Sequence, residues 1–280
     1  MRFATRFAPS PTGLLHRGHA FSALTAFDAA RAAEGRFVLR IEDIDATRSR
    51  PDHEAAILED LAWLGLAWET PVRRQSEHLA DYHAALDVLR AKGLVYRCFR
   101  TRKELDIGRA PHETAAPFTG APLPPPEEAA RLARGEAFAW RLSLDAARSA
   151  LGGFEGLSFV EHGAGPNGET GPIAARPELA GDIVLARKDV GVAYHLAVVL
   201  DDALQGVTQV IRGQDLFEAA HIQRLLQALL ALPTPTYRHH RLLTGPDGKR
   251  YAKRDKAQTL RDLRAAGVTP AQLRAEIGLA

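Results

Sequence analysis

The chain has 280 residues with a formal net charge of +2, and 46% of them are hydrophobic and 25% charged. This composition is typical of a globular protein with a sizeable core, and it excludes a disordered chain. The longest apolar stretch, "VAYHLAVVL", is too short to span a bilayer, and the N-terminus lacks the apolar segment of a secretory signal. The single cysteine, Cys98, excludes an internal disulfide and a zinc site built from cysteine pairs. We therefore expect a soluble protein of the reducing cytoplasm.

The N-terminal part of the chain predicts a βαβ unit. Residues 1–8 and 36–43 have the composition of strands, and residues 18–33 form an alanine-rich helical pattern between them. The turn "PSPTG" leads from the first strand toward the helix. Because a helix connects the two strands, we expect an α/β protein with a parallel sheet. Two further helices are predicted in residues 51–66 and 76–93.

The middle of the chain differs in composition. Residues 108–128 are rich in proline and show no period, which predicts an extended connector. We therefore divide the chain into the first half of a larger domain (1–96), a smaller inserted α/β subdomain (97–176) and the second half of the larger domain (177–280).

Strand composition returns after the predicted insertion. Residues 181–189 and 192–202 have the apolar, β-branched character of strands. Residues 208–216, "TQVIRGQDL", predict another strand, which leads into a helical pattern in residues 217–232.

The segment "LLHRGHA" places His16, Gly18 and His19 where the first predicted helix begins. A helix N-terminus presents unpaired N–H groups and a partial positive charge, and histidines add donors for phosphate oxygens. Gly18 has no side chain, so a base or sugar can lie against the backbone there. The alternative is a capped helix with two surface histidines. Its position in the first βα turn of a parallel sheet, where nucleotides bind, favours a phosphate site.

Acidic side chains follow the second predicted strand. Glu42, Asp43 and Asp45 lie at its carboxyl end, where ligands bind in such sheets. A carboxylate there can receive an ammonium group or a ribose hydroxyl. The alternative is an ion pair with Arg40 or Arg48.

Arginines close two other predicted strands. Arg6 ends the first strand and Arg212 lies at the end of "QVIRG", and the planar guanidinium recognises carboxylates with two parallel bonds. Two arginines and one carboxylate at a pocket suit a dicarboxylic amino acid. Residues 236–264 add nine Lys or Arg against three Asp, a pattern that fits a phosphate-binding loop, an RNA contact or a solvated basic face.

Together these segments resemble the class I aminoacyl-tRNA synthetases of the glutamyl type. "RFAPSPTGLLHRGHA" is similar to the His-Ile-Gly-His signature of that family, with Arg17 in place of the isoleucine. "RIEDID" is similar to its acidic segment, and "RYAKR" takes the place of its Lys-Met-Ser-Lys-Ser loop. The matches run in order from Phe3 to about Leu263. The resemblance implies a Rossmann-like parallel-sheet catalytic domain that carries the smaller insertion.

The segment "YHLAVVLDDALQGVTQVIRGQDL" resembles a truncated branch of this family, the glutamyl-Q tRNA(Asp) synthetases. That branch lacks the anticodon-binding domain, and we expect the same of a chain that stops at Ala280. Its enzymes activate glutamate with ATP without tRNA, and attach it to the queuosine base in the anticodon of tRNA(Asp). The resemblance implies these substrates, with Mg²⁺ accompanying ATP.

The resemblance also implies roles for individual residues. His16, Gly18 and His19 bind ATP, the two histidines stabilise its α-phosphate, and Lys253 balances charge as pyrophosphate leaves. Glu42 receives the ammonium group of the substrate, and two arginines bind its carboxylates in an order that stays open. The implied glutamate site consists of Arg6, Ala8, Ser10, Glu42, Tyr194 and Arg212.

The chain departs from the family pattern in two places. Many members carry a zinc site that begins Cys-x-Cys, whereas here Arg100 follows Cys98 at the partner position, so we expect no zinc, with His112 as a weak substitute ligand. The loop motif keeps Lys253 but has Ala252 in place of a serine, a loss that can slow adenylation.

Three other functions stay open. The chain can be a truncated glutamyl-tRNA synthetase that charges a tRNA 3′ end, a nucleotidyltransferase with the same His-x-Gly-His fold, or a non-catalytic paralogue that binds nucleotide or RNA. The pairing of "RIEDID" with "QVIRG" disfavours the nucleotidyltransferase, and the degenerate loop keeps the paralogue open.

Overall fold

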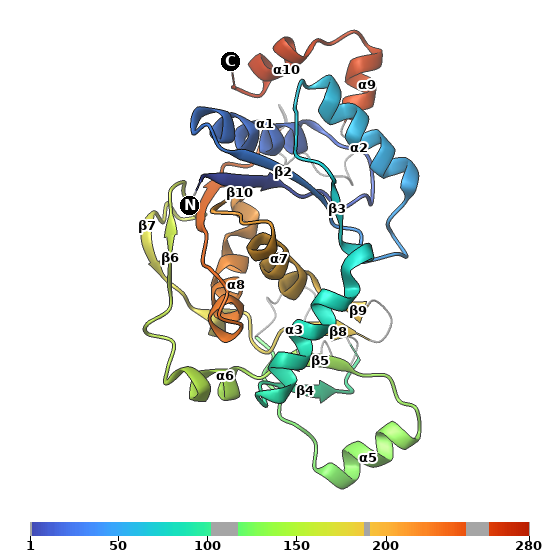
Figure 1. Cartoon of the computed structure of the whole chain (residues 1–280), viewed down its shortest axis with the longest axis vertical. Coiled ribbons are helices and arrows are strands. Elements are labelled where there is room, and N and C mark those ends of the chain that lie inside the picture. Colours follow the sequence, from blue (N-terminus) through green and yellow to red (C-terminus); the bar gives the residue numbers. More distant parts are fainter. Residues whose placement is uncertain (1, 102–116, 188–190, 245–257, 280) are drawn as a thin grey trace.

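The computed structural model describes residues 2–101, 117–187, 191–244 and 258–279. At its centre two sets of parallel strands lie side by side and together form a layer, called the sheet below, that carries helices on both faces (Figure 1). The strands are β1 (Ala4–Phe7), β2 (Arg36–Ile41), β3 (Arg73–Arg74), β4 (Val95–Cys98), β5 (Ala139–Leu142), β6 (Ser158–Glu161), β7 (Gly171–Ala174), β8 (Val184–Arg187), β9 (Gly191–Val192), β10 (Gln209–Gly213) and β11 (Thr236–His240). The α-helices are α1 (Arg17–Ala32), α2 (Pro51–Trp63), α3 (Leu79–Ala91), α5 (Pro125–Ala133), α6 (Leu144–Leu151), α7 (Tyr194–Leu204), α8 (Phe217–Leu229), α9 (Leu260–Ala265) and α10 (Pro270–Glu276).

The βαβ unit predicted from the N-terminal sequence is confirmed. Strand β1 pairs with β2 in parallel, and α1 connects them. Strands β10 and β11 form a second parallel pair. The Thr208 N–H donates to the Ala4 oxygen at 2.9 Å, so β10 begins beside β1. The carboxyl ends of β1, β2 and β10 consequently lie at one edge of the sheet.

The sheet separates two hydrophobic cores. Helices α1, α2, α9 and α10 cover one face, while α7 and α8 cover the other (Figure 1). Leu24 and Leu39 belong to the first core, and Leu196 and Leu225 to the second, and all four are at most 1% exposed. Burying such side chains contributes about 1.5 to 3 kcal/mol each, so the sheet is fixed from both sides.

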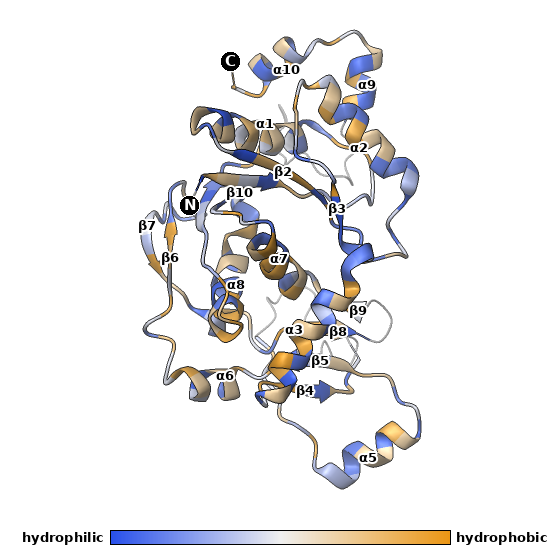
Figure 2. Cartoon of the chain, viewed as in Figure 1, coloured by the Kyte–Doolittle hydropathy of each residue, from blue (hydrophilic) through white to orange (hydrophobic). Residues whose placement is uncertain are grey.

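The prediction of a strand in residues 192–202 is wrong, because most of this segment forms helix α7. Leu196, Ala197, Val198 and Val199 are consecutive and all buried. A helix that is apolar on nearly every side gives no 3.6-residue period, so its composition resembles that of a buried strand. Figure 2 shows α7 as a strongly hydrophobic helix in the middle of the molecule.

The inserted region forms a separate antiparallel sheet in the order β4-β5-β8-β9. The adjacent hairpin of β6 and β7 pairs instead with β11, through Glu161 and Tyr237. Strands on the two sides of the predicted boundary at residue 176 thus pair with each other: β5 with β8, and β6 with β11. The division into domains stays a prediction.

The predicted connector of residues 108–128 is extended only in part. Residues 102–116 lie outside the described part of the chain, and residues 117–124 contain no helix or strand. Helix α5 begins at Pro125, because proline fits the first helical turn and Glu127 and Glu128 complement the positive helix end there.

Candidate active site

A cavity of about 530 Å³ opens at the carboxyl ends of β1 and β10, next to the N-terminus of α1. Its wall contains every described residue to which the family resemblance assigns a role, while Lys253 lies outside the described residues. These residues are Arg6, Ala8, Ser10, His16, Gly18, His19, Glu42, Tyr194 and Arg212. We call the part formed by His16, Gly18 and His19 the helix end, and the part formed by Arg6, Glu42 and Arg212 the arginine end.

The two histidines of the helix end cap α1 reciprocally. His16 Nδ1 accepts from the Gly18 N–H at 3.1 Å, and His19 Nδ1 accepts from the His16 N–H at 3.1 Å. Since each Nδ1 is an acceptor, a neutral imidazole carries its proton on Nε2. A Cβ atom at Gly18 would lie 3.1 Å from His16 Cε1, so a side chain there would press on the ring. Hydrogen bonds between residues close in the sequence thus help to orient both rings.

The segment after residue 257 returns to the helix end. Thr259 forms an isolated antiparallel bridge with His16, and the Leu260 N–H donates to the Leu15 oxygen at 2.8 Å. Before the undescribed stretch, Leu243 lies in the cavity wall. Both flanks of residues 245–257, which include Lys253, therefore lie beside the cavity.

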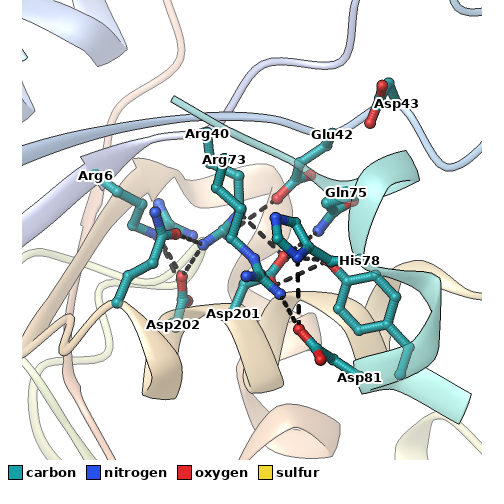
Figure 3. Close-up of polar contacts among 12 residues, drawn as sticks. Arg6, Arg40, Glu42, Asp43, Arg73, Gln75, His78, Asp81, Asp201 and Asp202 are labelled. Atoms are coloured by element: carbon teal, nitrogen blue, oxygen red, sulfur yellow. Dashed lines mark hydrogen bonds and ion pairs between the residues drawn. The ribbon is translucent and has the colours of Figure 1, made fainter. Parts of the chain in front are cut away.

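At the arginine end, Arg6 is held by a carboxylate of α7. Its Nε donates to Asp202 Oδ1 at 3.2 Å, and Arg40 Nη1 donates to the same oxygen at 2.8 Å (Figure 3). Burial favours the neutral form of Asp202, but the two guanidinium groups outweigh it and keep the pKa of this carboxyl below its usual range. Asp202 is therefore ionised between two buried cations.

The side chain of Glu42 is only 9% exposed, and it lies between the cavity and Arg40. Arg40 Nη2 donates to Glu42 Oε1 at 3.1 Å, so the ion pair considered from the sequence exists. Burial raises the pKa of Glu42 above its usual range, although Arg40 and Arg6 oppose that shift. Because burial makes the ionised form of Glu42 costly, a further cation, such as a substrate ammonium group, would stabilise that form.

The sequence did not predict a role for Asp201, the second carboxylate of α7 beside Arg40. Asp201 is fully buried and accepts from Arg73 Nε at 2.7 Å and from Gln75 Nε2 at 2.8 Å (Figure 3). The Tyr82 hydroxyl donates to it at 2.9 Å. The available signal was an acidic pair, "DD", directly after an apolar run, since buried carboxylates require partners.

Arg212 is held by three side chains from three elements. Its Nε donates to His239 Nε2 at 3.0 Å, and its Nη1 donates to Gln223 Oε1 at 3.0 Å and to the Tyr194 hydroxyl at 3.5 Å. Its Nη2 is buried and has no hydrogen-bond partner among the described residues. A buried, unpartnered guanidinium nitrogen in a cavity wall is a donor ready for an anion.

The other two carboxylates of "RIEDID" lie away from this cavity. Asp43 accepts from the Ser76 N–H at 2.8 Å, and Asp45 pairs with Arg48 at 2.6 Å, which is the alternative considered from the sequence. Asp45 lies instead in the wall of a neighbouring cavity of about 250 Å³, which shares Ser10, Glu42 and Tyr194 with the first. Of the three predicted carboxylates, only Glu42 reaches the main site.

Several polar wall residues were not predicted. Ser22 Oγ lies 2.7 Å from His240 Nε2, within the cavity wall. His240 is the last residue of β11 and Arg241 follows it, so the preference of ligands for strand ends, which pointed to Arg6 and Arg212, also points to these two residues. The unpredicted polar residues of the wall are Ser22, Asp215, His240 and Arg241.

Over the residues that the structure describes, no three His, Cys, Asp or Glu side chains gather as a metal site. Cys98 is buried with a free thiol. His112 lies outside the described residues, so the absence of zinc stays a prediction. In the same described part of the chain, no helix is long and apolar enough to cross a membrane.

The fold and the cavity define a class of protein: an α/β domain with a polar cavity at the carboxyl ends of parallel strands, beside the N-terminus of the first helix. Residues 2–138 and 168–280 match the sequence model of the catalytic domain of class I tRNA synthetases (E and Q). The chain therefore belongs to this family of aminoacyl-tRNA synthetases, which confirms the resemblance seen in its motifs.

Individual relatives agree with this assignment. The chain is 48% identical to a glutamyl-Q tRNA(Asp) synthetase of Rhodobacter capsulatus, over 98% of this chain and 99% of that protein. It is 43% identical to the enzyme of the same name from Symbiobacterium thermophilum, over 95% and 82% of the two chains. A crystal structure of a glutamate tRNA ligase from Elizabethkingia meningosepticum, in complex with its amino acid, is 27% identical with a TM-score of 0.75, and the match covers 91% of this chain and 52% of that one.

Proposed function

We propose that the protein activates L-glutamate with ATP, without tRNA, and transfers the glutamyl group to the queuosine base in the anticodon of tRNA(Asp). One observation carries the proposal: a single cavity collects the described residues predicted for both glutamate and ATP. The similarity to a glutamyl-Q tRNA(Asp) synthetase, over nearly the full length of both chains, supports the choice of nucleic-acid substrate.

In the first step a carboxylate oxygen of glutamate attacks the α-phosphorus of ATP. The bond from that phosphorus to the β-phosphate oxygen breaks, and pyrophosphate leaves with the electron pair. His16 and His19 donate from Nε2 to the α-phosphate, because their Nδ1 atoms are engaged in the cap. Lys253, which lies in the sequence between described residues that flank the cavity, balances the charge of the departing pyrophosphate.

The Mg²⁺ ion enters with ATP as part of the substrate. It is held largely by phosphate oxygens and water, and needs at most one or two protein carboxylates. Of the two carboxylates in the cavity wall, Glu42 is assigned to glutamate and Asp215 is not, so Asp215 is the residue that could contact such an ion.

Glutamate binds at the arginine end. Glu42 receives its ammonium group, while Arg6 and Arg212 bind its carboxylates. Arg6 is oriented by Asp202, and Arg212 presents its buried Nη2 as an available donor among the described residues. Ala8, Ser10 and Tyr194 complete the wall around the substrate.

In the second step a hydroxyl of queuosine attacks the carbonyl carbon of the mixed anhydride, and AMP leaves. Holding the two reactants together supplies most of the acceleration, and we assign no general base. Since tRNA and ATP are substrates, the proposal includes the cytoplasm as the place of action.

The first step is tested by glutamate-dependent exchange of pyrophosphate into ATP without tRNA. The expected result is exchange; its absence favours a non-catalytic nucleotide- or RNA-binding paralogue. The second step is tested by transfer of labelled glutamate to tRNA(Asp) with and without queuosine. Equal transfer to both would support the other candidate, a 3′-end glutamyl-tRNA synthetase, which the structural match to a glutamate tRNA ligase keeps in view.

The role of Lys253 is tested by Lys253→Ala. Removing a charge that stabilises the transition state should slow exchange by roughly 100-fold or more, while circular dichroism shows an unchanged fold. An unchanged exchange rate would mean that the segment around Lys253 was wrongly assigned.

A further inference from the structure

Behind Arg212 lies a buried carboxylate–histidine pair to which the proposed chemistry assigns no role. His239 Nε2 accepts from Arg212 Nε at 3.0 Å, and His239 Nδ1 lies 2.6 Å from Glu161 Oε2. The side chains of Glu161 and His239 are both 0% exposed. The three residues form one chain of hydrogen bonds that ends in the cavity wall.

The donors and acceptors of this chain allow only one arrangement of protons. Arg212 Nε–H can only donate, so His239 Nε2 must be an unprotonated acceptor. The proton of a neutral His239 then lies on Nδ1 and is donated to Glu161 Oε2. A proton on Nε2 would place two donors against each other and displace the guanidinium group.

Glu161 is itself fixed by backbone donors. Its Oε1 accepts from the N–H groups of His239 at 2.8 Å and Gly163 at 2.7 Å. Burial favours its neutral form, but the hydrogen bonds from His239 and Gly163 outweigh burial and keep its pKa below the usual range. Burial in turn lowers the pKa of His239, so the imidazole is neutral. A Cβ at Gly163 would lie 2.1 Å from the His239 oxygen, so only glycine fits this turn.

We propose that Glu161 is a positioning residue for substrate binding: through His239 it sets the tautomer that holds the Arg212 guanidinium group in the cavity wall, where it binds the anionic group of the substrate. The proposal rests on the function proposed above, because it takes Arg212 as a ligand of glutamate. Glu161 lies in residues 139–167, between the two stretches that match the family, so this part of the chain contributes to the site from outside the matched residues.

The test is Glu161→Gln, which keeps the size of the side chain. The amide oxygen still accepts from the two backbone N–H groups, so the amide NH₂ faces His239 Nδ1. The His239 proton then moves to Nε2, opposite Arg212. In ¹⁵N-histidine NMR spectra the wild type should show a pyridine-like Nε2 and a pyrrole-like Nδ1, and Glu161→Gln should exchange these signatures.

Kinetics separate positioning from simple support of the fold. In pyrophosphate exchange, Glu161→Gln should raise KM for glutamate by about tenfold or more, because the charge-assisted bonds of Arg212 are misaligned, while KM for ATP stays within about twofold. Glu161→Asp keeps a carboxylate and should retain the wild-type tautomer with a smaller rise. Glu169→Gln is the matched control, since the half-buried Glu169 lies on the same hairpin and forms hydrogen bonds only within its own loop among the described residues.

The outcomes are distinct. An Nε2-protonated His239 in the wild type, or an unchanged KM for glutamate after the tautomer is exchanged, overturns the proposal. Equal rises in KM for both substrates also overturn it, since they indicate a structural role. If the wild type shows no glutamate-dependent exchange, the proposed function fails, while the tautomer measurement still decides whether Glu161 fixes His239.

Discussion

At the helix end of the cavity, His16, Gly18 and His19 are neighbours in the sequence and orient one another. At the arginine end, Arg6 and Arg212 come from two strands, and each is held by side chains from other parts of the chain. The first end is oriented by hydrogen bonds between residues close in the sequence. The second depends on tertiary packing, because each buried cation needs a buried anion or acceptor to remain stable. Substitutions at the two ends should therefore differ in their effects on the stability of the fold and on substrate binding.

The largest expected effect is at the arginine end. Asp202→Asn leaves Arg6 and Arg40 facing each other with a neutral partner, so the free energy of unfolding should fall by about 3 to 5 kcal/mol. Urea denaturation measures this. Asp81→Asn is the control: Asp81 pairs with Arg73 but is 44% exposed, and its loss should cost less than about 1 kcal/mol. Equal losses would show that the buried pair is no more important than a surface one.

Arg212→Ala separates substrate binding from stability at the same end. Removing the guanidinium group should raise KM for glutamate by about 100-fold, while KM for ATP stays within about twofold of the wild type. Steady-state exchange kinetics give both constants. Arg238→Ala, on an exposed position of β11, should change neither. A collapse of ATP affinity alone would contradict the assignment of Arg212 to the amino acid.

Asp60 offers a contrast to Asp202, because neither of its oxygens has a hydrogen-bond partner among the described residues and its nearest cation is Arg264 at 3.8 Å. Burial raises the pKa of Asp60 to about 6. Between about pH 4 and pH 6, Asp60 is therefore protonated in the folded state and ionised in the unfolded state. The cost of ionising Asp60 is full above that range and absent below it.

Asp60→Asn should accordingly stabilise the protein at pH 8 by about 1 to 3 kcal/mol relative to its effect at pH 4. The difference between the two pH values is the readout, since the unpaired amide contributes equally at both. Urea denaturation of wild type and variant at each pH provides it. A difference of zero, or of the opposite sign, would mean that Asp60 is not ionised at a cost in the folded state.

The smallest effect on stability is expected at the helix end. His16→Ala removes one side-chain cap from α1 and should lower the free energy of unfolding by about 1 kcal/mol. Its effect on exchange should be on KM for ATP or on kcat, not on KM for glutamate. A rise in KM for glutamate alone would contradict the assignment of ATP to the helix end and of glutamate to the arginine end.

The same contrast explains what the sequence could predict. The helix end was found because its residues are adjacent and follow a strand. Arg6, Glu42 and Arg212 were found because they lie at strand ends, where ligands bind in parallel sheets. The placement of each of these residues in the cavity wall follows from the parallel topology alone.

The residues that hold those side chains could not be predicted in the same way. The acidic pair Asp201 and Asp202 indicates buried carboxylates that need partners, but it does not say which residues these are, and Glu161 has no comparable signal. The partners of all three are far away in the sequence. Residues 192–202 were assigned to a strand, so the pattern gave no reason to place Asp201 and Asp202 beneath β1 and β2. Helix α7 is buried on so many sides that its apolar residues show no helical period.

The most direct test of the central claim is a crystal structure with a non-hydrolysable sulfamoyl analogue of glutamyl-adenylate. We predict that its phosphate mimic lies beside His16 and His19, with the glutamyl carboxylate at an arginine and the ammonium group at Glu42. An analogue bound in the opposite direction, or outside the cavity that contains Arg6 and Arg212, would contradict the account.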